Sequence, residues 1–188
     1  MAPDILHEKE AIQLLKDAVS IRSYSGEEKE VAEFLVREMG AMGFRAHIDE
    51  AGNAIGIIGP ENDGPDNAAR TILFAGHMDT VPGEIPIRIE RDASGRDVLY
   101  GRGSVDAKGP LCAFIEGAGR AARRLGDDGD TRIIVAGCVE EECASSKGAR
   151  HLIRMFSGHN HKPDMIIIGE PSGTSGITLG YKGRLVIN

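Results

Sequence analysis

The sequence has no apolar run that could cross a membrane. Its longest apolar stretches, such as Met165–Ile168, are far shorter than the ~20 residues that a membrane-spanning helix needs. The amino-terminal residues MAPDILHEKE also lack the basic flank and apolar core of a secretory signal peptide. We therefore expect no membrane partner and a cytoplasmic location.

Clusters of basic side chains are missing as well. The 22 lysines and arginines are scattered and are outnumbered by 29 acidic residues, which leaves a net charge of -7. Nonspecific nucleic-acid binding draws its affinity from clustered lysines and arginines that meet phosphates. We therefore expect no nucleic-acid partner.

Cysteine is scarce, with only Cys112, Cys138 and Cys143 in the chain. An odd number of cysteines without any CxxC spacing suits neither a disulfide framework nor a closed structural zinc site. We expect reduced thiols, and we interpret Cys138 and Cys143 as small buried residues.

What is present is an ordinary globular composition, 41% hydrophobic and 27% charged over 188 residues. This is enough chain for one domain with a sizeable core, or for one domain and the start of a second. Apolar residues at helical spacing predict one helix over residues 8–18 and another that opens at Ser25-Gly-Glu-Glu-Lys. We interpret both as amphipathic packing helices.

Strands and helices alternate further along the chain. Two short strands are predicted within residues 45–59, and residues 61–68 are predicted to form an exposed loop. Strands at 71–75, 132–139 and 165–169 then alternate with helices at 110–125 and 146–156. This order predicts an α/β fold with a mostly parallel sheet that helices cover on both faces.

Acidic residues and one histidine follow the predicted strands. His77 and Asp79 follow the first long strand, three glutamates at 140–142 end the next, and Glu170 ends the last. Asp106 lies in a glycine-rich loop that leads into a helix. Because functional groups collect at the carboxyl ends of strands in open α/β sheets, we expect these side chains to converge on one edge.

Carboxylates that share a site repel one another, and divalent cations remove that penalty. Imidazole and carboxylate ligands suit zinc, and also cobalt or manganese. In two-metal hydrolases the ions sit ~3.5–4 Å apart and share a bridging ligand. Asp106 is the natural bridge in this sequence.

Each feature also has a purely structural interpretation. His77 with Asp79 could be a hydrogen-bonded pair, Asp106 a loop aspartate, and the glutamate run a solvated edge. The occurrence of all of them at strand ends favours a site. His159 and His161 lie in a polar segment without an acidic neighbour, so we interpret them as surface residues.

Four motifs occur in one order: GHMDTVP at 76–82, GRGSVDAKG at 101–109, EEE at 140–142 and GEP at 169–171. They resemble the GHxDxVP, GRGxxDxKG, acidic-Glu-Glu and GEP motifs of the two-metal aminoacylase, ArgE/DapE and carboxypeptidase-G family of amidohydrolases and peptidases. The resemblance covers essentially the whole chain. It implies the catalytic α/β domain of a di-metal aminopeptidase-like hydrolase that carries two Zn²⁺ or Co²⁺ ions.

The resemblance also implies a set of metal ligands. His77 and Glu170 would hold one metal ion, Asp106 would bridge the two ions, and Glu142 would bind the second. Family members draw a further histidine ligand of the second ion from their last part. No residue here is assigned that role, which leaves the second site incomplete in this chain.

Two further roles follow from the resemblance. Glu141 would be the general base that takes a proton from the attacking water and then protonates the leaving amine. Asp79 would hydrogen-bond His77 and raise its basicity. The pair Glu140–Glu141 is the alternative register, and we prefer Glu141–Glu142 because the preceding strand aligns without a gap to the family's Asp-Glu-Glu.

The flanks of these motifs resemble most the family members that release lysine or ornithine from an amino-group carrier protein in lysine and arginine biosynthesis. An N-acyl amino acid deacylase of the acetylornithine or succinyl-diaminopimelate type is the alternative. A third hypothesis is a non-catalytic metal-binding fragment.

Family members are about twice as long as this chain and contain a lid or dimerisation domain. Residues 1–176 therefore resemble the amino-terminal part of the catalytic domain, and residues 177–188 resemble the first strand of the lid. A homodimer is expected at full length.

Overall fold

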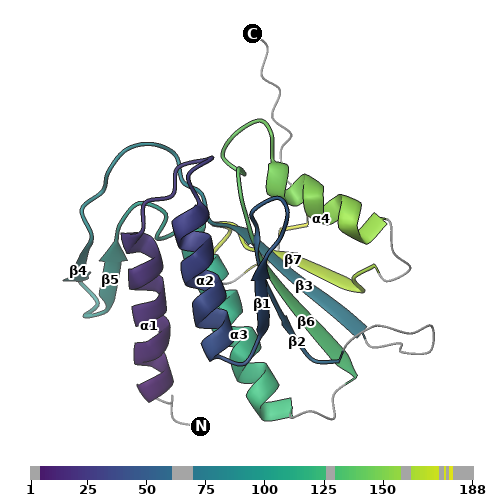
Figure 1. The fold of residues 1–188 in the computed structure, drawn as a ribbon. Coiled ribbons are helices and arrows are strands. Elements are labelled where there is room, and N and C mark those ends of the chain that lie inside the picture. The colour runs from purple at the N-terminus through teal and green to yellow at the C-terminus, as the bar shows by residue number, and fades with distance from the viewer. Residues whose placement is uncertain are drawn as a thin grey trace.

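Figure 1 shows the fold in a computed structural model of the chain, which describes residues 5–60, 70–125, 130–157, 162–173, 176 and 178–179. His159, His161 and the expected loop at 61–68 lie outside the described residues. So does the expected lid strand at 177–188, apart from residues 178–179. No helix in the described ranges has the length and apolar character to span a bilayer.

The predicted helices and strands are present, with boundaries that differ by a few residues. The elements are, in chain order, α1 (Ile5–Ser20), α2 (Lys29–Ala41), β1 (Arg45–Ile48), β2 (Ala54–Ile58), β3 (Arg70–His77), β4 (Arg88–Arg91), β5 (Asp97–Tyr100), α3 (Lys108–Leu125), β6 (Thr131–Cys138), α4 (Lys147–Ser157) and β7 (Met165–Ile168). The sequence prediction missed the antiparallel hairpin of β4 and β5.

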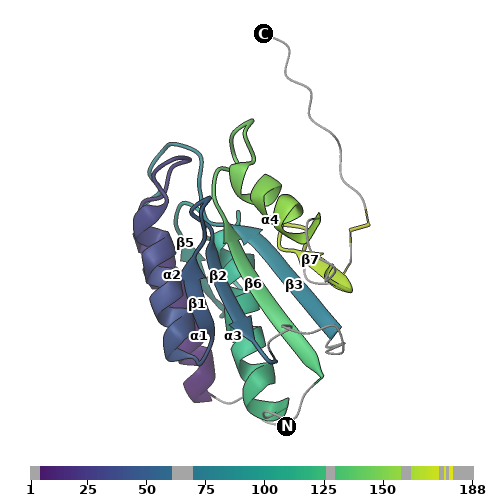
Figure 2. The same cartoon turned by 45° about the vertical axis from the view of Figure 1, so that its right-hand side comes forward.

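The central sheet has the strand order β1-β2-β6-β3-β7. β3 pairs in parallel with both β6 and β7, whereas β2 runs antiparallel to β1 and β6. Four of the five strands therefore point the same way, which confirms the prediction of a mostly parallel sheet. Figure 2 shows the strands fanned in this order.

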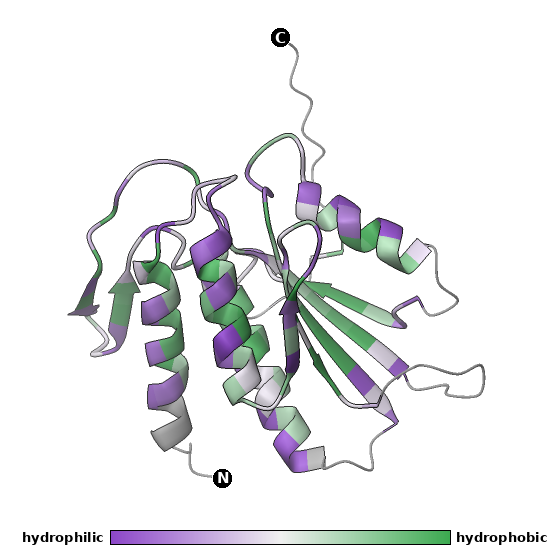
Figure 3. Cartoon of the chain, viewed as in Figure 1, coloured by the Kyte–Doolittle hydropathy of each residue, from purple (hydrophilic) through white to green (hydrophobic). Residues whose placement is uncertain are grey.

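Helices cover both faces of the sheet, as the alternation of side chains along β6 shows. Ile133 and Val135 join the core that packs against α1, α2 and α3. Ile134 and Ala136 point the other way and pack with Leu152 of α4. In Figure 3 the strands β3, β6 and β7 are hydrophobic over most of their length, while α2 is hydrophobic on one side and hydrophilic on the other.

The helical cover does not extend to the edge strand β7. All four of its residues are exposed, including Met165 at 53% and Ile168 at 66%. Ile153 of α4 is 65% exposed on the same side of the molecule. An apolar hollow of about 500 Å³ lies between these elements and reaches the carboxyl end of β3.

Candidate metal centre

Strand pairing brings the sequence-predicted site residues to one edge. His77 is the last residue of β3 and is paired with Cys138, so the glutamates at 140–142 begin immediately beside it. Ala75 is paired with Ile168, which places Glu170 on the other side of β3. The strand extends further than the sequence predicted, since His77 lies within it.

His77 lies at the centre of this group and is buried. Its Nε2 lies 3.0 Å from Asp106 Oδ1 and 3.8 Å from Glu141 Oε2. Its Nδ1 lies 3.0 Å from the backbone oxygen of Asp79 and 3.4 Å from Oδ1 of the same residue. Burial alone would lower the pKa of His77, but the hydrogen bonds to Asp79 and Asp106 outweigh it and raise the pKa to about 9.

Asp79 is fully buried beneath the histidine. It accepts hydrogen bonds from the hydroxyl of Ser25 at 2.6 Å and from the backbone N–H groups of Glu141 and Glu142 at 3.0 Å. Burial would raise the pKa of this carboxyl, but its hydrogen bonds hold the pKa below the usual value. Asp79 therefore joins the end of β3 to the glutamate segment as an anion.

Two sets of ligand atoms lie close enough to hold a metal ion. Atoms of His77, Asp106 and Glu170 lie within 4.8 Å of one another, as do atoms of His77, Glu141 and Glu142. Burial, followed by repulsion from neighbouring carboxylates including Asp106 and Glu141, raises the pKa of Glu142 and of Glu170. A divalent cation relieves this repulsion, and nitrogen with carboxylate oxygen is a donor set that such cations use.

The three glutamates point in different directions. Glu140 accepts a hydrogen bond from the hydroxyl of Ser145 at 2.6 Å, and its other oxygen lies 3.7 Å from the ammonium of Lys147. Glu141 and Glu142 instead supply atoms to the cluster around His77. The side chain of Glu140 is thus engaged outside the cluster.

The cysteines remain free thiols, as the sequence predicted. Burial raises the pKa of Cys112 and of Cys138 to about 12, which keeps both protonated at neutral pH. The prediction that Cys143 is buried was wrong, because it lies half-buried in the turn after the glutamates, 2.9 Å from the hydroxyl of Ser145.

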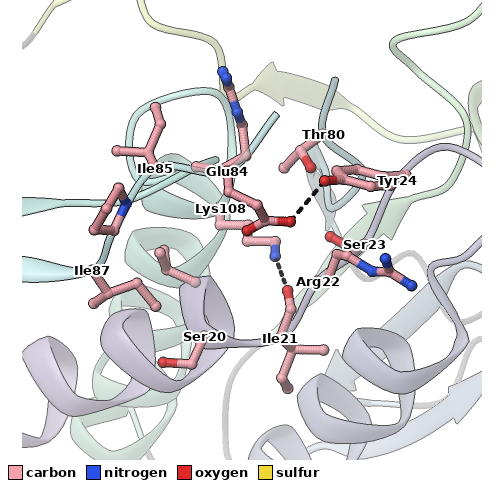
Figure 4. Close-up of a pocket in the computed structure, with 13 residues that line it drawn as sticks. Ser20, Ile21, Arg22, Ser23, Tyr24, Thr80, Glu84, Ile85, Ile87 and Lys108 are labelled. Atoms are coloured by element: carbon pink, nitrogen blue, oxygen red, sulfur yellow. Dashed lines mark hydrogen bonds between the residues drawn. The ribbon is translucent and has the colours of Figure 1, made fainter. Parts of the chain in front are cut away.

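A cavity of about 260 Å³ lies between the end of α1 and the segment from Thr80 to Ile87 (Figure 4). Lys108 stands at its base and is almost completely buried. The Lys108 ammonium donates to the backbone carbonyls of Ala18 at 3.0 Å and Ile21 at 2.6 Å. Burial lowers the pKa of Lys108 to about 8. Lys108 therefore links the loop that carries Asp106 to the end of α1.

We expect Lys108→Met to destabilise the fold at pH 7. Methionine fills a similar volume but leaves two carbonyls without their donor, which costs about 1–3 kcal/mol for a buried polar group. Urea unfolding would measure the change. Lys29→Met is the control, because Lys29 is 86% exposed and should change stability by less than about 0.5 kcal/mol. Equal stability of the two variants would contradict a structural role for Lys108.

The fold and the cluster together define the class of this protein: an α/β protein with a histidine and carboxylates of the types that bind metal ions at the carboxyl edge of its sheet. Residues 73–182 match the profile of Peptidase family M20/M25/M40. The chain belongs to this family, which confirms the resemblance in the sequence motifs.

The names of individual relatives are more specific than the name of the family. The chain is similar to a protein named [LysW]-lysine hydrolase from Deinococcus radiodurans, with 51% identity over 94% of this chain and 44% of the relative. It is 33% identical to [LysW]-lysine/[LysW]-ornithine hydrolase from Saccharolobus islandicus, over 97% of this chain and 46% of the relative. The chain thus spans about half the length of the curated relatives it matches.

A solved structure shows the same fold. Human carnosine dipeptidase 1 superposes with a TM-score of 0.64 at 26% sequence identity, over 87% of this chain and 38% of the dipeptidase. This agreement confirms the predicted α/β catalytic-domain fold.

Proposed function

We propose that this chain is part of a metal-dependent amidohydrolase that releases lysine or ornithine from an amino-group carrier protein. The observation that carries the proposal is the 51% identity to the [LysW]-lysine hydrolase over 94% of the chain. The carrier protein is then the macromolecular partner. The enzyme would act in lysine and arginine biosynthesis, in the cytoplasm.

His77, Asp106 and Glu170 would hold one divalent ion, and Asp106 with Glu142 would hold the second. The mutual distances of the first three side chains and the raised pKa of Glu142 and Glu170 support this assignment. Bound ions of this kind, Zn²⁺ or Co²⁺, polarise a scissile carbonyl and lower the pKa of an attacking water.

Glu141 is the proposed general base. Its side chain is 46% exposed, and one of its oxygens lies 3.8 Å from His77 Nε2, so it faces both the cluster and solvent. From this position Glu141 can take a proton from the attacking water and deliver it to the leaving amine. Asp79 keeps the imidazole of His77 oriented through the contacts at Nδ1.

We propose that residues 1–176 form the amino-terminal part of a larger catalytic domain and that residues 177–188 begin a lid through which the protein dimerises. The matched relatives are about twice as long. The exposed face of β7 and the apolar hollow beside α4 are surfaces that further polypeptide would cover. A histidine from that polypeptide would complete the second metal site.

The test measures the hydrolysis rates of several substrates by the complete protein, isolated from its own cell and loaded with zinc or cobalt. We expect release of lysine or ornithine from the carrier protein to exceed hydrolysis of acetylornithine and succinyl-diaminopimelate. We expect little activity from the 188 residues alone, because in the proposed assignment one ligand of the second ion comes from a part of the protein outside them.

Other outcomes would favour the alternatives. Faster hydrolysis of the small acylated amino acids would identify a deacylase. Absence of hydrolysis with bound metal would favour a non-catalytic metal-binding protein. A rate for the 188-residue chain equal to that of intact relatives would overturn the proposal of a missing part.

A further inference from the structure

The backbone that carries the glutamates is held by side chains from three distant parts of the chain. Four successive N–H groups each donate to a side-chain oxygen at about 3 Å. The pairs are Val139 to Asn53, Glu140 to Glu28, Glu141 to Asp79 and Glu142 to Asp79. Asp79 belongs to the GHMDTVP motif, whereas Asn53 and Glu28 lie outside all four motifs.

Glu28 is the least expected of these acceptors. It immediately precedes α2 and is only 5% exposed, yet its side chain makes no capping hydrogen bond to that helix. One carboxylate oxygen accepts from Gly26 N at 2.9 Å and from Glu140 N at 3.0 Å. Burying a carboxylate is costly unless it is hydrogen-bonded, so this placement stabilises the conformations of both backbone segments.

The backbone at Glu140 needs such support. Its φ of 55° lies in the left-handed region, which disfavours residues other than glycine. A conformation of this kind costs about 1–3 kcal/mol and persists where surrounding contacts determine it. Glu140 is where the chain leaves β6, so its conformation sets the course of the backbone at Glu141 and Glu142.

Ser25 attaches the connection between α1 and α2, which also carries Glu28, to the end of β3. Its hydroxyl donates to Asp79 at 2.6 Å. Ser23 donates through its hydroxyl to the carbonyl of Met78 at 2.7 Å, and the N–H of Thr80 donates to the carbonyl of Ser23 at 2.8 Å. The connection between α1 and α2 is therefore fixed to β3 at one end and reaches the glutamate segment at the other.

We propose that Glu28 and Ser25 are positioning residues that hold Glu141 and Glu142 at the metal centre. The inference rests on the proposed function, in which Glu141 moves the proton and Glu142 is a ligand. A shift of about 1 Å in a catalytic group can cost about 10²-fold in rate, so the support of this backbone matters for turnover.

The main test is Glu28→Met in the complete protein. Methionine retains the side-chain length but cannot accept from the two N–H groups. We expect kcat and zinc affinity each to fall by about 10–100-fold, as for other supporting groups around metal ligands, with little change in KM. Glu28→Gln keeps an acceptor oxygen and should restore both values to near those of the wild type. Glu30→Met is the control, since Glu30 is exposed on α2.

Wild-type kcat and zinc affinity in folded Glu28→Met would overturn the proposal. If that variant does not fold, Ser25→Ala decides, because it removes only the hydroxyl that donates to Asp79. We then expect a several-fold loss of kcat at unchanged KM, and wild-type kinetics would overturn the proposal. If the wild-type protein hydrolyses no amide, the proposed function fails. Zinc affinity of the same variants still decides whether Glu28 and Ser25 position the site.

Discussion

Glu141→Gln is expected to lower kcat for amide hydrolysis by about 10²–10⁴-fold, the range that a general acid–base group supplies. Glutamine has the same shape and keeps an oxygen, but it cannot take up the proton of the attacking water. The side chain of Glu141 is half exposed and its backbone is held separately by Asp79, so the substitution should leave the fold intact. In the proposed assignment Glu142 and not Glu141 is the metal ligand, so zinc content should stay at the wild-type value.

Glu140→Gln is the matched comparison, because it makes the same chemical change one residue earlier. The side chain of Glu140 bonds to Ser145 outside the cluster, so we expect kcat close to that of the wild type. The opposite result, a large loss at Glu140 and a small one at Glu141, would identify the alternative register. Comparable losses of kcat at both positions would contradict the assignment of Glu141 alone as the general base.

Asp106→Ala in the complete protein is expected to weaken binding of the metal pair strongly. Asp106 is the proposed bridge, and its carboxylate contributes to the ligand group with His77 and Glu170. Loss of a supporting group behind a ligand costs about 10–100-fold in affinity, and loss of the bridging ligand should exceed about 100-fold. Zinc titration against a competing chelator would measure the change.

The Asp106 substitution should not disturb folding. The side chain of Asp106 is 53% exposed, and the substitution removes its contact with His77 Nε2 at 3.0 Å. Asp97→Ala is the control, because Asp97 is 62% exposed on β5 and belongs to neither ligand group. Wild-type zinc affinity in folded Asp106→Ala would contradict the proposed metal site.

The helices and long strands could be predicted because their patterns are local. β6 alternates between the two cores along its length, and α2 carries one apolar face. The β4–β5 hairpin escaped prediction because its strands are short and lie on the surface. One of its contacts places the guanidinium of Arg88 over the ring of Tyr100, and this pairing joins residues on different strands, so it is not a local property of the sequence.

The supporting residues of the site could not be predicted for a different reason. Ser25-Gly-Glu-Glu has the pattern of a helix start, and Asn53 has that of a turn. Their hydrogen-bond partners lie far away in sequence, at Asp79 for Ser25 and at Glu140 for Glu28. A local pattern carries no information about such partners.

The sequence by itself determined which side chains stand at the ends of β3, β6 and β7, because strand ends and ligand types are local properties. It also determined the family, through the order of four motifs. Only the tertiary structure decided that β3 lies between β6 and β7 and that Glu141 and Glu142, rather than Glu140, face His77. The physical reason is that strand pairing and the backbone turn at Glu140 depend on hydrogen bonds between segments distant in the chain.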